Sequence, residues 1–293
     1  MRLETKGYKY FTWFNNVFLI LLALACLFPL IHVLALSFSS SSAAAAGEVM
    51  LWPVEFTLSS YEYVAAKSEF WRSMFVSFQR ILLGGTINFL VTILLAYPIS
   101  REPKEFKPRT FLAWFLFMTM LFNGGLIPWY IVIKEAGLLD TIWALVLPNA
   151  VPVFNVILLI NFFRQLPKEL DEAAYVDGAG HWTILWKIYI PLSLPVLATV
   201  TLFSLVMHWN SWFDGLILMN KPDNYPLQSF LQTVIIQQDL SMITSGDLEG
   251  LSEISDRTLK SAQIFLGCLP IFLVYPFLQR YFVKGIVIGS VKG

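Results

Sequence analysis

The chain has 293 residues, of which 57% are hydrophobic and 14% are charged, and its formal net charge is zero. So few charged residues could not cover a water-soluble protein of this length, which excludes soluble domains and predicts an all-α protein that crosses a membrane several times. The balanced charge gives no support for nucleic acid as a partner. The orientation of the chain in the membrane is judged from the positions of the charged residues along the sequence.

Six apolar runs follow a basic N-terminal segment, residues 1–10. Each run is long enough for a helix that crosses a hydrocarbon core of about 30 Å. The first exceeds the apolar segment of a cleavable signal peptide, so we expect it to be retained. The sequence therefore predicts a six-helix transmembrane domain over residues 11–283, with spans at about 11–37, 71–100, 110–133, 141–163, 191–219 and 261–283.

Lysine and arginine indicate the orientation of these spans. Thirteen of the 20 basic residues lie in the N-terminus, in two alternate loops, or after residue 279. The positive-inside rule then places both termini, the loop 164–190 and the tail 284–293 in the cytoplasm. The external connections include residues 39–70, whose Ser/Ala-rich start favours flexibility, and the loop 220–260.

A polar segment of about thirty residues, 166–195, separates the fourth and fifth runs. Pro167 suits the first turn of a short helix, and acidic side chains follow it at the positive end of that helix. Gly178 is a natural stop. A second short helix is expected from about Gly180 to Tyr189, ending near Pro191. Because helices this short are marginal alone, they need a docking surface on their own membrane domain or on a partner.

The spacing within this segment resembles that of a known family. Glu172-Ala173-Ala174, three residues, Gly178, nine residues, Ile188, one residue, Ile190 and Pro191 resembles the EAA loop of ABC-importer permeases, a cytoplasmic coupling helix that sits in a groove on the ATPase subunit. The family usually has Leu where this chain has Ile190, and Asp177 fits its carbohydrate branch. The resemblance implies ATPase contacts at Glu169, Glu172, Ala173, Ala174, Asp177, Gly178, His181 and Pro191.

The end of the chain supplies a second resemblance. The stretch KGIVIGSVKG, residues 284–293, is too short to fold alone. It resembles the C-terminal tail of maltose-type permeases, which reaches toward the ATPase dimer. Further ATPase contacts are implied at Gly289, Ser290, Lys292 and Gly293.

The resemblance implies a type I ABC importer permease in the inner membrane of a bacterium. The implied partners are a non-identical second permease, a dimer of ATPase subunits that bind ATP and Mg, and an external solute-binding protein; the implied cargo is carbohydrate, as an oligo- or polysaccharide. The chain itself has no phosphate loop, no H-E-x-x-H and no cysteine/histidine metal spacing. We therefore expect neither an enzyme nor a resident cofactor or metal.

Polar and aromatic residues within the spans are candidates for a substrate pathway. The stretch from His208 to Asp214 offers aromatic faces for sugar rings and polar groups for their hydroxyls, although an interfacial aromatic belt would look similar. Arg80 either lines a polar cavity or pairs within the bundle. The stretch 123–130 resembles permeases for complex saccharides, with packing kinks as the alternative. The candidates are Arg80, Asn123, Asn149, Asn155, Trp209, Asn210, Trp212 and Asp214.

Two other functions remain open. An ion-coupled secondary sugar carrier would bury carboxylates near the bilayer midplane, where these spans hold almost none. An ABC permease for a non-sugar solute such as an amino acid or peptide would keep the mechanism and change only the cavity. Within the complex-saccharide branch, an acidic oligosaccharide such as a uronate polymer is one candidate, supported by Arg80.

Overall fold

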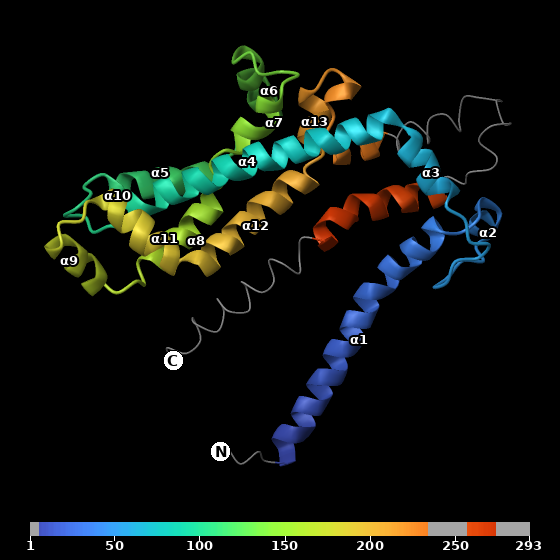
Figure 1. Ribbon diagram of the computed structural model, residues 1–293, viewed down its shortest axis with the longest axis horizontal. Helices are drawn as coiled ribbons and strands as arrows, with labels where there is room; N and C mark the ends of the chain where they lie inside the picture. Colours follow the sequence, from blue (N-terminus) through green and yellow to red (C-terminus); the bar gives the residue numbers. More distant parts are fainter. Residues whose placement is uncertain (1–5, 234–256, 274–293) are drawn as a thin grey trace. The chain divides into compact units, whose positions relative to one another are not determined.

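A computed structural model describes residues 6–233 and 257–273, which form helices and connecting turns and contain no strand (Figure 1). The all-helical architecture expected from composition is confirmed for this part of the chain. The chain divides into two compact units, one formed by Met1–Ser68 with Thr233–Leu269 and the other by Glu69–Gln232 with Pro270–Gly293. The predicted C-terminal contacts at 289–293 lie outside the described residues, as do parts of the loop 220–260 and of the run 261–283.

The first unit contains a long apolar helix, α1 (Lys6–Ser37), of 32 residues. Its most apolar window has a mean hydropathy of 2.8, and none of that window is buried. At 1.5 Å per residue the helix is about 48 Å long, enough to cross a hydrocarbon core of about 30 Å. The exposed apolar surface of α1 is therefore suited to lipid.

The Ser/Ala-rich segment after α1 is helical rather than flexible. Helix α2 (Ser41–Ala46) is capped at its start by Ser40, whose Oγ accepts a hydrogen bond from the Ala43 N–H at 3.3 Å. Gly47 ends it in the left-handed conformation, with φ of 76°. Two caps hold a segment that composition alone suggested was unstructured. Helix α3 (Ser59–Ala66) follows and is tied to the helix at 257–273 by a hydrogen bond from Ser60 Oγ to Thr258 Oγ1.

The second unit is organised around α4 (Ser68–Ser100), a helix of 33 residues. Large hydrophobic side chains such as Phe75, Phe78 and Leu82 are exposed on one side. Its buried polar side chains are spaced by three, four or eight residues and therefore share the opposite side. This inward-facing polar stripe reverses the pattern of a water-soluble helix and comprises Ser73, Ser77, Arg80, Asn88 and Thr92.

The predicted third span is broken in its middle. Helix α5 (Arg109–Leu121) meets α6 (Leu126–Glu135) at 117°. Gly125, with φ of 87°, adopts a conformation that other residues rarely take, and its N–H donates to Asn123 Oδ1 at 2.8 Å. Helix α5 alone is about 20 Å long, shorter than the hydrocarbon core.

The fourth predicted span is also bent, and the fifth, predicted over 191–219, is bent at its start and divides into two helices, α12 (Leu194–Asn210) and α13 (Phe213–Leu218). Helix α7 (Ile142–Val146) and the 3₁₀ turn η1 (Leu147–Asn149) meet α8 (Val153–Phe163) at 43°, between two prolines. The helical run His181–Leu192 meets α12 at 83°. Since proline removes a backbone donor and clashes with the preceding turn, these bends lie where the sequence carries prolines. Helix α13 and the turn η3 (Pro222–Asn224) follow α12, and residues 227–233 are again helical.

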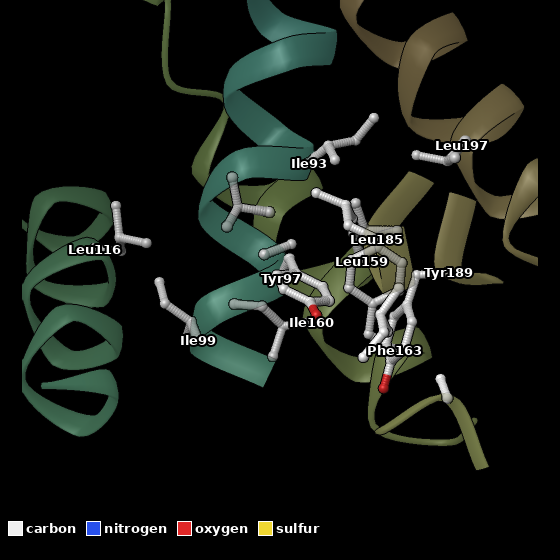
Figure 2. Packing of buried hydrophobic residues seen from close by; sticks show 14 residues of the cluster. Ile93, Tyr97, Ile99, Leu116, Leu159, Ile160, Phe163, Leu185, Tyr189 and Leu197 are labelled. Atoms are coloured by element: carbon white, nitrogen blue, oxygen red, sulfur yellow. The ribbon is translucent and has the colours of Figure 1, made fainter. Parts of the chain in front are cut away.

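A buried hydrophobic cluster joins α4, α8 and the segment that precedes α12. Figure 2 shows Tyr97 and Ile93 on α4 facing Leu159 and Phe163 of α8, with Tyr189 beside them. Leu159 has no exposed surface, and Phe163 is 2% exposed. Residues of the polar segment 166–195 pack in and against this cluster.

A second cluster joins α6, α7 and α13, and its members include Ile133, Leu145 and Leu218. Asp140, between α6 and α7, fixes the chain that follows α13. Its carboxylate accepts the Asn224 side-chain amide at 2.9 Å and the Asn220 N–H at 3.1 Å. These hydrogen bonds hold the pKa of Asp140 below its ordinary value, chiefly through the Asn224 side chain.

Candidate functional site

The first candidate site is the segment Glu169–Tyr189, called here the coupling segment. Helix α9 (Glu169–Val176) carries three acidic residues in its first turn, where the helix dipole favours negative charge. The turn after α9 closes with hydrogen bonds from Gly178 N–H to the Tyr175 carbonyl and from Ala179 N–H to the Ala174 carbonyl, at 3.0 and 2.9 Å. This pattern is a Schellman motif, which requires the left-handed conformation that Gly178 adopts, with φ of 75°.

The second helix of the coupling segment begins after Gly180. Helix α10 (His181–Ile184) continues through a π-helical turn, η2 (Leu185–Tyr189), into α11 (Ile190–Leu192), so the run ends next to Pro191. Ala174 on α9 and Ile184, Leu185 and Tyr189 on the second run all join the buried cluster of Figure 2. Burial of each large apolar side chain contributes about 1.5–3 kcal/mol. The chain's own membrane domain therefore supplies the docking surface for one face of both short helices.

The exposed side chains of the coupling segment include several large apolar ones besides its charged residues. Val176 is 88% exposed, Trp182 65%, Trp186 47% and Tyr175 40%. Large apolar side chains are thus exposed at the end of α9 and on the helical run after Gly180, and we call this group the hydrophobic ridge; large exposed apolar surfaces commonly mark interaction sites. Gly178 also lies on this exposed side, because a Cβ added there would meet no atom within 4 Å.

The structure divides the predicted coupling residues into two groups. The exposed group is open to a partner and comprises Glu169, Glu172, Ala173, Asp177, Gly178, His181 and Pro191. Ala174 is instead 8% exposed and packs against the chain's own core. Its small side chain therefore lets α9 approach the membrane domain. The His181 ring nitrogen Nδ1 also lies 3.3 Å from the Tyr97 hydroxyl oxygen.

The second candidate site is a buried polar network on α4 and the α12–α13 corner. Arg80 has no exposed surface, and its guanidinium donates two hydrogen bonds to the Asp214 carboxylate, one of them at 3.1 Å, and one to the Ser211 carbonyl at 3.2 Å. Asp214 also accepts from Ser211 Oγ and from the Gly215 N–H. A charge this deeply buried is tolerated only when it is paired and hydrogen-bonded, as it is here.

His208 extends the network, through Asn88, to the end of η1. One ring nitrogen, Nδ1, lies 3.5 Å from Arg80 Nε, and the other lies 2.8 Å from Asn88 Oδ1. The amide of Asn88 in turn donates to the Asn149 and Ala150 carbonyls, at 2.6 and 3.0 Å. The network thus ties α4 to α12 and to the bend between η1 and α8. Of the predicted pathway residues, it unites Arg80 and Asp214 directly, and Asn149 through its backbone.

The remaining pathway candidates are not brought to one place. Asn155 is buried, and its amide donates to the Val200 carbonyl and to Ser204 Oγ, so it joins α8 to α12. Trp209 is 4% exposed, and its ring centre lies 6.0 Å from that of Phe78. The exposed candidates are Asn123, Asn210 and Trp212.

Sequence reasoning did not select Asn88, nor the group of Arg101, Asp171 and Tyr189. Asn88 completes the buried network together with His208, which lies in the candidate stretch 208–214, and a signal for Asn88 was present. Its position eight residues after Arg80 places both on one face of a helix that is otherwise apolar. Arg101 contacts Asp171 and Tyr189 of the coupling segment, and nothing local in the sequence indicated these contacts. In the described part of the chain, no group of three or more His, Cys, Asp or Glu side chains is placed to hold a metal ion.

Residues 6–288 of this chain match the family of binding-protein-dependent transport system inner membrane components. The chain belongs to this family. The resemblance to ABC-importer permeases is thereby confirmed, and the permease is an inner-membrane component of a binding-protein-dependent transport system. Subunits of this kind do not hydrolyse ATP themselves; hydrolysis belongs to a partner.

Curated relatives and a solved structure agree with this placement. Protein LplC of Bacillus subtilis (strain 168) is 40% identical over 290 residues, which cover 99% of this chain and 97% of the relative. The polygalacturonan/rhamnogalacturonan transport system permease protein YtcP of the same organism is 38% identical, with coverage of 94% and 96%. A chain in the crystal structure of a bacterial ABC transporter involved in the import of the acidic polysaccharide alginate matches with a TM-score of 0.86 at 31% identity, covering 96% of this chain and 100% of that chain.

Proposed function

We propose that this permease is one of two transmembrane subunits of an ATP-driven importer for an oligo- or polysaccharide, and that its coupling segment docks on a partner ATPase. The observation that carries the proposal is the two-faced packing of that segment. One face is anchored in the chain's own core, while the other presents the ridge of Val176, Trp182 and Trp186. Such a ridge in the polar cytoplasmic loop of a membrane protein favours a permanent partner.

The proposed mechanism is alternating access. Closure of the ATPase dimer would move the coupling segment as a rigid body, and the bundle would open toward a loaded external binding protein; hydrolysis would reset it. In this arrangement six spans cross the membrane, both termini lie in the cytoplasm, and the second permease is a different subunit. The C-terminal residues Gly289, Ser290, Lys292 and Gly293 are proposed as further ATPase contacts.

We infer a carbohydrate cargo from the transport functions of the relatives, and an acidic polymer is the favoured class because polygalacturonan and alginate are both among their substrates. Arg80 does not add to this inference, since its charge is already neutralised by Asp214. The exposed Asn123, Asn210 and Trp212 are the proposed substrate contacts. An ion-coupled carrier and a permease for a non-sugar solute are the competing functions.

Gly178→Asp tests the docking role with little effect on the fold. A side chain at Gly178 meets no atom of this chain within 4 Å, so the variant's internal cost is the left-handed backbone, about 1 kcal/mol. Gly47→Asp is a matched control, because Gly47 has φ of 76° and equal space but lies in the first unit.

The experiment is a detergent pull-down with ATPase activity measured in the eluate. Wild type and Gly47→Asp should capture an ATPase and a second permease, whereas Gly178→Asp should lose the ATPase. If Gly178→Asp retained the ATPase as well as Gly47→Asp does, the docking assignment would be wrong. A wild type that elutes alone and moves sugar under an ion gradient would favour the carrier.

A further inference from the structure

The end of α4 and the coupling segment meet at a buried charged cluster. Arg101, the residue after α4, is 6% exposed, and its Nη1 donates to Asp171 Oδ2 on α9 at 2.5 Å. The Tyr189 hydroxyl donates to the same carboxylate oxygen at 2.8 Å. One carboxylate on α9 therefore joins two parts of the chain that are 88 positions apart, at 101 and 189.

Aromatic rings enclose the guanidinium group. Its central carbon lies 4.3 Å from the centre of the Tyr97 ring and 4.6 Å from that of Tyr189, and the two rings pack edge to face at 5.3 Å. Cation–π contacts of this kind are stronger when the cation is shielded from water. Burial, followed by the hydrogen bond to Asp171, raises the pKa of Tyr189 well above its ordinary value, so its hydroxyl remains a donor. Phe163 of α8 packs against Tyr189 from the far side, at 5.1 Å.

The ion pair is only half formed. Arg101 Nε and Nη2 and Asp171 Oδ1 are buried and have no hydrogen-bond partner among the described residues. A guanidinium and a carboxylate prefer two parallel hydrogen bonds, and Nη2 and Oδ1 are atoms that a second bond would use. A cavity of about 440 Å³ borders Arg101, Asp171, Glu172 and Tyr189. Space and unpaired atoms together allow α9 to shift while the pair is kept.

We propose that Arg101, Asp171 and Tyr189 form a clasp that transmits movement of the coupling segment into α4. The clasp is a charged link, mostly shielded from water, between α9 and the end of the helix that carries the buried network around Arg80. Its residues are positioning residues, since they act through α9 and touch neither the cargo nor ATP. The inference rests on the proposed coupling role and adds the route by which motion at the ATPase reaches the membrane helices.

A nearby surface pair provides a matched control. Glu102 and Lys168 also link the end of α4 to the start of α9, and their side chains are 49% and 74% exposed. An exposed pair is screened by water and contributes little, so it cannot transmit force as the enclosed pair does. Glu102→Gln should therefore leave coupling unchanged, although it joins the same two segments.

The test measures cargo moved per ATP hydrolysed by the complete importer in proteoliposomes. Arg101→Lys keeps the charge but loses the planar fork and its stacking. It should assemble with the ATPase yet lower the ratio about tenfold, as should Asp171→Asn. The combined Arg101→Lys and Asp171→Asn variant should be no worse than either alone, because both changes break one link.

The outcomes separate the clasp from the proposed function. If wild type shows no ATPase activity stimulated by the binding protein, the coupling role itself fails. If wild type is coupled and Arg101→Lys assembles with an unchanged ratio, the clasp alone is refuted. A purely structural role predicts fewer assembled complexes with a normal ratio, which would also refute it. Should Arg101→Lys fail to assemble, Tyr189→Phe, which removes only the hydroxyl, must lower the ratio at least twofold or the clasp is rejected.

Discussion

The Arg80–Asp214 pair allows the sharpest prediction about stability. Arg80→Met keeps much of the side-chain volume but leaves the Asp214 carboxylate, whose side chain is 9% exposed, without its cation. Removing one partner of a buried pair costs about 3–5 kcal/mol. Two remaining donors, Ser211 Oγ at 3.0 Å and the Gly215 N–H at 2.9 Å, should keep this loss near the lower figure.

Asp214→Asn should be the more harmful change. It leaves the guanidinium of Arg80, which has no exposed surface, without a counter-charge; its remaining acceptors are neutral, namely the new amide oxygen, the Ser211 carbonyl at 3.2 Å and the His208 ring at 3.5 Å. We expect a loss near 5 kcal/mol. The double variant removes both charges and keeps an amide oxygen that can accept from Ser211 and Gly215. Its loss of stability should therefore be smaller than the sum of the two single losses by about 2–3 kcal/mol.

The assay is equilibrium unfolding of the purified permease in mixed micelles, with Arg72→Met as control. Arg72 and Asp223 also join α4 to the segment after α13, at 3.1 Å, but their side chains are 57% and 54% exposed. Arg72→Met should therefore cost no more than about 1 kcal/mol. If Arg80→Met were no more destabilising than this control, or if the two single losses simply added, the buried network would not have the role assigned to it.

Three further predictions concern other contacts. Gly84→Ala should destabilise the permease by about 1–3 kcal/mol, because its Cβ would lie 2.4 Å from His208 Nε2; Gly124→Ala, whose Cβ meets only Pro128 at 3.8 Å, should cost less in the same unfolding assay. Because folding lowers the pKa of Asp140, its carboxylate stabilises the folded state above the ordinary aspartate pKa, and this stabilisation is lost as pH falls through the folded-state pKa. Asp140→Asn should therefore lose less thermal stability than wild type between about pH 5 and pH 3. An equal dependence of thermal stability on pH in the two proteins would contradict this. Asn210→Ala should reduce uptake while ATPase capture stays normal, and equal uptake by wild type and Asn210→Ala would remove Asn210 from the pathway. Trp209 is buried, so Trp209→Ala should instead lower the free energy of unfolding by about 3–5 kcal/mol.

The features of the fold that depend on local chemistry could be predicted from the sequence. The Gly178 turn, the bend near Pro148 and Pro152, and the break at Gly124-Gly125 each follow from the conformational preferences of one or two residues. Composition was enough for the all-helical class. The helix over 41–46 was missed because its caps, Ser40 and Gly47, outweigh the flexibility that the Ser/Ala composition suggested.

Contacts between distant segments were harder to foresee. That Arg80 meets Asp214, 134 positions later, depends on which helices pack together. Ala174 belongs to a motif that suggested contact with a partner, but its face is set by how α9 rests on Leu185 and Tyr189. The clasp at Arg101 was missed for the same reason, because its three members lie on three different segments.

Uptake of a labelled oligogalacturonide by proteoliposomes containing the purified complex tests the central claim most directly. The complex is reconstituted with its ATPase side facing the lumen, and the external binding protein is added. The account predicts uptake that requires ATP inside, persists when ionophores dissipate every ion gradient, and is lost in Gly178→Asp but not in Gly47→Asp. Uptake that ignores ATP and collapses with the ionophores would contradict the account and identify an ion-coupled carrier.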